Sequence, residues 1–188
     1  MTAELVFQTA AERIRELAQD LVDASDLYGD FMIGAGHAAD RFDAALFETK
    51  PTILRRLASL LAERIPPAVD RLAGAGPGAV AVVTAVALET GLPFVIVRHC
   101  SKGLGGNGFL AGELHPGERV LIVDDVLGTG AGALRAAARL ESAGASITGI
   151  LAVLDAGGAE NIAEVGYDLD VLYDRGRLAA LYRSGGDL

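Results

Sequence analysis

Residues 120–132, VLIVDDVLGTGAG, combine an apolar run, two adjacent acids and a loop of small residues. The apolar run predicts a buried strand, and Asp124 and Asp125 follow at its carboxyl end. The loop leads into a predicted helix, so several backbone N–H groups and the helix dipole can face one phosphate. Carboxylates beside such a loop are suited to ribose hydroxyls or a magnesium ion. The segment therefore predicts a binding site for a ribose 5-phosphate.

Other interpretations explain this segment less well. A VLIVDD string also opens response-regulator domains, but there it lies near the N-terminus, whereas here it begins at residue 120. A dinucleotide-binding turn would place glycines, not two acids, directly after the strand. A structural turn capped by an aspartate explains one acid but not the whole string.

The sequence around this segment alternates between short apolar runs and longer stretches of helical periodicity. Apolar runs predict strands at residues 68–73, 94–98, 119–123, 147–154 and 167–173, with a further short strand at 41–47. Helices are predicted at residues 3–24, 51–65, 79–90, 132–143 and 160–165. Loops rich in glycine are predicted at residues 74–78 and 101–112. This alternation indicates a parallel sheet covered on both faces, which binds ligands beyond the carboxyl ends of its strands.

Composition limits the classes of protein to which the chain can belong. Its 188 residues are 51% hydrophobic and 22% charged, which predicts one globular domain over residues 1–188 and excludes global disorder. A formal net charge of −9 argues against a nucleic-acid partner or an anionic membrane surface. The single cysteine excludes a disulfide within the chain and a thiolate zinc cluster. With neither a signal-peptide core nor an apolar run long enough to span a membrane, we expect a cytoplasmic protein.

Several segments, in the same order, resemble the type I phosphoribosyltransferases and, within them, the orotate phosphoribosyltransferase group. The resemblance covers about residues 31–178 and rests on RFDAALFETKP (41–51), TAVALETGLPFVIVR (84–98), Lys102-Gly103, VLIVDD (120–125) and GGAENIAEVG (157–166). It implies an α/β type I phosphoribosyltransferase fold, with a mainly parallel five-stranded sheet flanked by helices. A small hood from about residues 1–50 would cover a core at about 66–174. The resemblance also implies a homodimer.

The resemblance further implies a reaction and the residues that perform it. Members of the family transfer ribose 5-phosphate between phosphoribosyl pyrophosphate (PRPP) and a base, release pyrophosphate and use Mg²⁺. Lys102, Asp124 and Asp125 would be catalytic, and the two aspartates would hold the ribose hydroxyls directly or through magnesium. The PRPP contacts would be Gly76, Gly78, Ala79, Arg98 and Lys102 for pyrophosphate, and Val126, Leu127, Gly128, Thr129, Gly130, Ala131 and Gly132 for the 5-phosphate. Phe31, His37 and Asp155 are the expected acceptor contacts.

The chain departs from the family pattern at several positions of this site. Gly78 stands where the pyrophosphate loop often has a lysine, and His99 stands at a position that is often basic. At residues 155–158, Asp-Ala-Gly-Gly lacks the arginine expected to pair with the carboxylate of orotate. The acceptor is thus either orotate held by other contacts or a less acidic base. The alternative is a catalytically weak sensor that binds PRPP or a nucleotide, although the retained Lys102 favours an enzyme.

Overall fold

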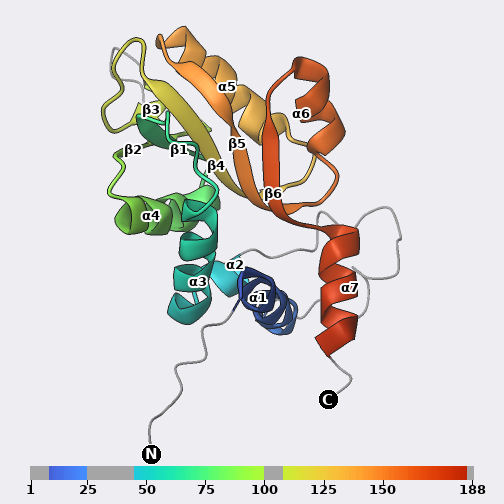
Figure 1. Cartoon of the computed structure of the whole chain (residues 1–188). Coiled ribbons are helices and arrows are strands. Elements are labelled where there is room, and N and C mark those ends of the chain that lie inside the picture. Colours follow the sequence, from blue (N-terminus) through green and yellow to red (C-terminus); the bar gives the residue numbers. More distant parts are fainter. Residues whose placement is uncertain (1–8, 25–44, 100–107, 186–188) are drawn as a thin grey trace, which may run out of the picture.

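The computed structural model describes residues 9–24, 45–99 and 108–185 (Figure 1). Its helices are α1 (Ala10–Ala24), α2 (Ala45–Glu48), α3 (Pro51–Ala62), α4 (Ala79–Thr90), α5 (Ala131–Ser142), α6 (Ala159–Val165) and α7 (Arg175–Gly185). Its strands are β1 (Arg71–Ala75), β2 (Phe94–Val97), β3 (Leu110–Ala111), β4 (Arg119–Leu127), β5 (Ser146–Asp155) and β6 (Leu169–Asp174).

The strands form one sheet in the order β3-β2-β1-β4-β5-β6. Strands β1, β2, β4, β5 and β6 are parallel, and only the short β3 runs antiparallel to its neighbour β2. The predicted five-stranded parallel sheet is confirmed, with β3 as an added edge strand. The chain first proceeds from β1 to β2 and then returns to β4 on the other side of β1. The carboxyl ends of β1 and β4 therefore flank the point where the strand order reverses, the usual ligand position in such sheets.

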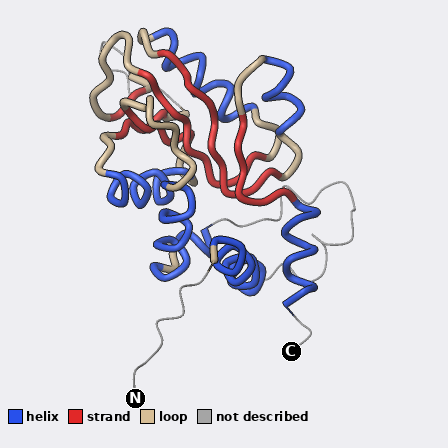
Figure 2. Tube along the Cα trace, viewed as in Figure 1, coloured by secondary structure: helices blue, strands red, loops and turns tan. Residues whose placement is uncertain are grey.

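Helices cover both faces of the sheet. Helices α3 and α4 pack on one face, whereas α5 and α6 pack on the other (Figure 1). The crossover helices before and after the reversal lie on opposite faces because each connection between parallel strands is right-handed. Figure 2 shows the strands as the layer between these helices. With both faces covered, residues 150–154 of β5 are buried without alternation, as expected of a central parallel strand.

Helix α1 is joined to the core by polar contacts as well as by apolar packing. It begins with a capping box, in which Thr9 Oγ1 accepts the N–H of Glu12 and Glu12 Oε2 accepts the N–H of Thr9. Arg13 pairs with Glu63 beyond α3 at 2.8 Å, and the buried hydroxyl of Tyr173 donates to the carbonyl of Ile14 at 2.7 Å. The predicted hood over the strand ends stays a prediction, because residues 25–44 lie outside the described part of the chain.

Several predicted boundaries were wrong. Within the described residues, the strand expected at 41–47 is the helical turn α2, since a few apolar residues around the buried Phe47 fit either conformation. Helix α3 ends at Ala62 instead of 65, because the proline at 66 disfavours the helical conformation just before it. Strand β1 starts at 71 instead of 68 and runs to 75, into the loop expected at 74–78.

Strand β4 continues past 123 to Leu127, because residues 124, 126 and 127 still pair with β5. Strand β3 falls in the loop expected at 101–112, and α7 was not predicted.

Among the described residues, no helix is long and apolar enough to cross a membrane.

Candidate functional site

The loop after β1 lies against Asp125 of β4 where the strand order reverses. Gly78 precedes α4, and a Cβ atom at this residue would lie 2.3 Å from Oδ2 of Asp125 and 2.9 Å from its Cγ. The carboxylate of Asp125 thus occupies the space that any side chain at residue 78 would need. The position of the Asp125 carboxylate therefore explains why glycine stands at residue 78.

Asp124 is a buried carboxylate, only 6% exposed. Burial and the neighbouring Asp125 raise the pKa of Asp124 well above its usual range, and Glu48 adds to the effect. Its Oδ1 accepts the N–H of Asp125 at 3.1 Å. Within the described residues, no arginine or lysine forms an ion pair with either aspartate. Two adjacent carboxylates without a protein cation fit Mg²⁺, which prefers oxygen ligands, and they also fit ribose hydroxyl donors.

The small-residue loop beyond β4 packs against residues 158 and 161 on one side and has open space beside Gly128 and Gly132. Gly130 starts α5 in the left-handed conformation, with φ 74°. Gly158 packs on it so closely that a Cβ at 158 would lie 2.7 Å from the Gly130 nitrogen, and Asn161 Nδ2 donates to the Thr129 carbonyl at 2.9 Å. Apart from the adjoining backbone, no atom of the described residues lies within 4 Å of the Cβ positions that side chains at Gly128 or Gly132 would have. A fixed loop with open space at the start of a helix suits a phosphate.

Asp155 caps the helix that supports this loop. Its Oδ1 accepts the N–H groups of Gly157 at 2.9 Å, Gly158 at 2.7 Å and Ala159 at 3.2 Å. One carboxylate oxygen of Asp155 is therefore engaged in ordering the turn before α6, and its contact with an acceptor stays a prediction. Asp155 lies four residues before the start of α6, so a search for a capping residue directly before the helix does not find this contact.

The end of β2 approaches the loop after β1 from the other side. The N–H of Arg98 donates to the carbonyl of Phe109 at 2.7 Å, and the imidazole of His99 lies over Gly76. A Cβ at Gly76, whose φ is 97°, would lie 2.7 Å from His99 Nε2. The structure thus brings the ends of β2, β1 and β4 together, as the predicted binding site requires.

Some site predictions lie outside the described residues, and some site features were missed. Phe31, His37 and Lys102 lie in the undescribed ranges. Sequence reasoning missed Asn161 and Arg139. Arg139 stands in the last turn of α5, and its sequence neighbours contain no signal of its contacts.

A sequence model of the phosphoribosyl transferase domain matches residues 47–172. The chain belongs to the phosphoribosyltransferase family. The matched range includes the loop after β1, the end of β2, both aspartates of β4 and the loop before α5. Each of these parts of the site therefore lies within the phosphoribosyltransferase domain.

Relatives and solved structures agree with this assignment. The orotate phosphoribosyltransferase of Natronomonas pharaonis is 36% identical over 170 residues, which cover 88% of this chain and 97% of that protein. The orotate phosphoribosyltransferase of Mycobacterium tuberculosis, solved with Fe(III) dicitrate, has a TM-score of 0.75 at 26% identity, covering 88% of this chain and 98% of that one. UMP synthase of Leishmania donovani has a TM-score of 0.75 at 29% identity, and the match covers 93% of this chain but only 39% of that longer protein.

The predicted type I phosphoribosyltransferase fold is thereby confirmed, as is the predicted class of enzyme. Phosphoribosyltransferases of this class transfer ribose 5-phosphate between PRPP and a base and release pyrophosphate.

Proposed function

We propose that this phosphoribosyltransferase transfers ribose 5-phosphate from PRPP to an orotate-like or other aromatic base, with Mg²⁺ held at Asp124 and Asp125. The observation that supports this most strongly is the contact between Asp125 and Gly78 at the reversal of strand order. This contact brings the loop after β1, which is suited to pyrophosphate, next to strand β4. Strand β4 in turn leads directly into residues 128–132, the loop that is suited to the 5-phosphate. The carboxylates then lie between the two ends of one PRPP molecule.

Each end of PRPP has its own binding elements in this proposal. The 5-phosphate accepts hydrogen bonds from backbone amides of residues 128–132. The pyrophosphate lies beside residues 76–79, Arg98 and Lys102, where cations offset the negative charge that develops as it leaves. When bound, Mg²⁺ supplies further positive charge for the pyrophosphate. Asp124 and Asp125 accept hydrogen bonds from the ribose hydroxyls or bind the metal, and either contact orients the anomeric carbon.

The transfer breaks the bond between the anomeric carbon and the pyrophosphate oxygen and forms a bond from that carbon to a ring nitrogen of the base. The proton of that nitrogen is released to water. Positive charge grows on the ribose in the transition state and negative charge on the departing pyrophosphate. Arg98 and Lys102 act on the negative side of this separation. Holding the base against the anomeric carbon supplies the orientation that a bimolecular reaction in water lacks.

The acceptor base is expected to lie beside the turn that follows β5. The turn at residues 155–158 has no cationic side chain, and Ala156 within it is buried. Recognition of a carboxylate on the base would therefore come from outside this turn, and Phe31 and His37 stay as proposed acceptor contacts. Since the curated relative cited above is named for orotate, orotate is the first base to test.

Release of pyrophosphate from PRPP and Mg²⁺ tests this function across orotate, uracil, adenine, hypoxanthine and simple aromatic acids. We expect one base to release pyrophosphate with the wild type, and we expect Lys102→Ala to abolish release while PRPP still binds. If PRPP binds and no base reacts, the enzyme proposal is wrong for these acceptors, and a PRPP-binding sensor of the same fold takes its place.

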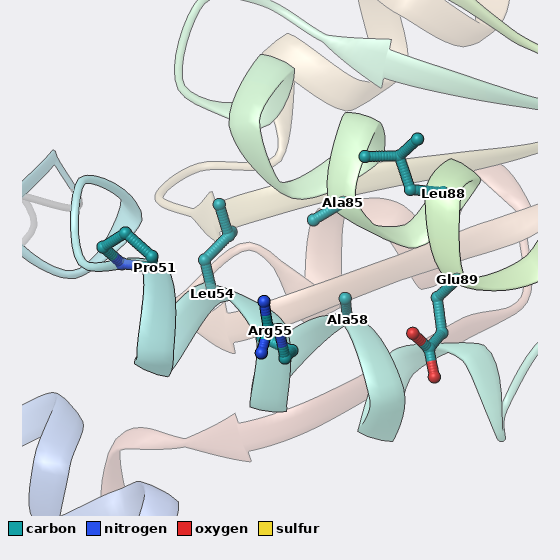
Figure 3. Close-up of a pocket in the computed structure, with 7 residues that line it drawn as sticks. All are labelled: Pro51, Leu54, Arg55, Ala58, Ala85, Leu88 and Glu89. Atoms are coloured by element: carbon teal, nitrogen blue, oxygen red, sulfur yellow. The ribbon is translucent and has the colours of Figure 1, made fainter.

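We also propose a cytoplasmic homodimer. A cavity of about 250 Å³ lies between α3 and α4. Figure 3 shows the side chains that line it. Its floor is mostly apolar, Leu88 is 83% exposed, and Arg55 and Glu89 give its two sides opposite charges. Two copies related by a two-fold axis could pair these opposite charges across the apolar floor. Light scattering after gel filtration tests this, since Leu88→Glu should yield a monomer and an unchanged dimer would exclude this surface.

A further inference from the structure

The guanidinium of Arg139 joins the two ends of the segment that leaves β2 and returns at β3. Its Nη1 donates to the carbonyl of Arg98, and its Nη2 donates to the carbonyl of His99 at 3.2 Å. Its central carbon lies 4.0 Å from the centre of the Phe109 ring. One side chain thus contacts the chain just before residues 100–107 and just after them.

The contacts of Arg139 add to the pairing of β2 with β3, and these two paired strands are called the stem below. Strands β2 and β3 are antiparallel, and the hydrogen bond from the Arg98 N–H to the Phe109 carbonyl extends their pairing by one residue pair. Arg139 contacts both residues of this last pair, Arg98 and Phe109, from the face of the sheet that α5 covers. The His99 carbonyl is held there, while the imidazole of the same residue lies over Gly76 in the loop suited to pyrophosphate.

Helix α5 connects this stem to the opposite end of the site. The helix begins at the loop suited to the 5-phosphate, and Arg139 stands in its last turn. At 1.5 Å per residue, Arg139 lies about 12 Å along the helix from its start. The helix that presents one end of the PRPP site therefore also fixes the position of the other end.

We propose that Arg139 is a positioning residue for pyrophosphate, which holds the backbone of Arg98 and His99 at the end of β2 so that the His99 imidazole faces the loop after β1. This inference rests on the proposed function, because it takes that end of the site to bind pyrophosphate. An arginine suits the task because its planar fork reaches two carbonyls while its face stacks on a ring. Within the described residues, no carboxylate forms an ion pair with Arg139, so its charge also favours an anion nearby.

Calorimetry with two probes tests the proposal. Pyrophosphate with Mg²⁺ reports on the end of β2, and ribose 5-phosphate reports on the start of α5. The variants are Arg139→Gln and, as a matched control, Arg135→Gln, which removes an exposed arginine one turn earlier on the same helix. We expect Arg139→Gln to weaken pyrophosphate binding about tenfold and ribose 5-phosphate binding less than twofold, with Arg135→Gln like the wild type. In steady-state assays, KM for PRPP should rise more than kcat falls.

Several outcomes would overturn the proposal. Unchanged pyrophosphate binding in Arg139→Gln would exclude a positioning role, and equal losses for both probes would indicate a general distortion of α5. If Arg139→Gln does not fold, Phe109→Leu tests the same brace, and it should weaken pyrophosphate binding selectively while its ribose 5-phosphate binding stays at the wild-type level. Absence of pyrophosphate binding in the wild type would refute the proposed function itself, and the inference with it.

Discussion

Replacing Gly78 by alanine should damage the site without damaging the fold. The backbone of Gly78 has φ −64° and ψ −42°, a right-handed helical conformation that alanine adopts freely. The new methyl group would, however, lie 2.3 Å from Oδ2 of Asp125. Carbon and carboxylate oxygen normally approach to about 3.3 Å, so the Asp125 carboxylate must move by about 1 Å.

A shift of this size is large for a catalytic group. A displacement of about 1 Å can cost about 100-fold in rate, and we expect kcat/KM for PRPP to fall by about 10- to 100-fold in Gly78→Ala. The free energy of unfolding should change by less than about 1 kcal/mol, because alanine is the better helix former and the carboxylate is free to turn away. Loss of activity with retained stability is the expected pattern.

Pyrophosphate release and urea denaturation measure these two quantities. Gly176→Ala is the matched control, because it makes the same change in α7, away from the site and in an exposed position. A double-mutant cycle isolates the contact: once Asp125→Ala has removed the carboxylate, adding Gly78→Ala should have no further effect on PRPP binding. Wild-type kcat/KM in Gly78→Ala, or full additivity in the cycle, would refute the reasoning.

Three further variants test other contacts. In the wild type, the hydrogen-bonded ion pair with the buried Arg71 lowers the pKa of Glu118 to about 2, so Glu118→Gln should lose about 1–3 kcal/mol of unfolding free energy near neutral pH. That difference, measured by urea denaturation, should shrink as pH falls from about 4.5 toward 2, where half of wild-type Glu118 is itself protonated. A constant difference would argue against the ion pair as its source. Tyr173→Phe removes the buried hydroxyl that binds a carbonyl of α1 and should cost about 1 kcal/mol in the same assay, so unaltered stability would count against that link between α1 and the sheet. Gly158→Ala places a methyl group 2.7 Å from the Gly130 nitrogen and should weaken ribose 5-phosphate binding about tenfold by calorimetry, whereas undiminished affinity would mean that this packing does not shape the phosphate loop.

The sequence predicted the parts of the fold that depend on local pattern. Apolar runs located the parallel strands, and helix α4 was predicted with its observed bounds. Asp124 and Asp125 were assigned to the site because they follow an apolar run and precede a glycine-rich loop. Each of these features is written in consecutive residues, which is why one sequence is enough to find it.

Contacts between distant segments could not be predicted in this way. The place of Asp125 against Gly78 follows from the pairing of β1 with β4, and the bonds of Arg139 follow from the packing of α5 beside β2. Strand β3 has only two residues, too few for a periodic signal, and it exists because β2 offers an edge to pair with. These features depend on tertiary structure, and no local spacing of residues indicates them.

The most direct test of the account is calorimetric titration of the wild type with PRPP in the presence and absence of Mg²⁺, repeated with Asp124→Asn. The account predicts that PRPP binds the wild type with Mg²⁺, and that the affinity falls when Mg²⁺ is omitted or Asp124 is replaced. Ribose 5-phosphate should still bind Asp124→Asn, because residues 128–132 hold its phosphate. Failure of the wild type to bind both PRPP and ribose 5-phosphate would contradict the central claim that the ends of β1, β2 and β4 form a PRPP site.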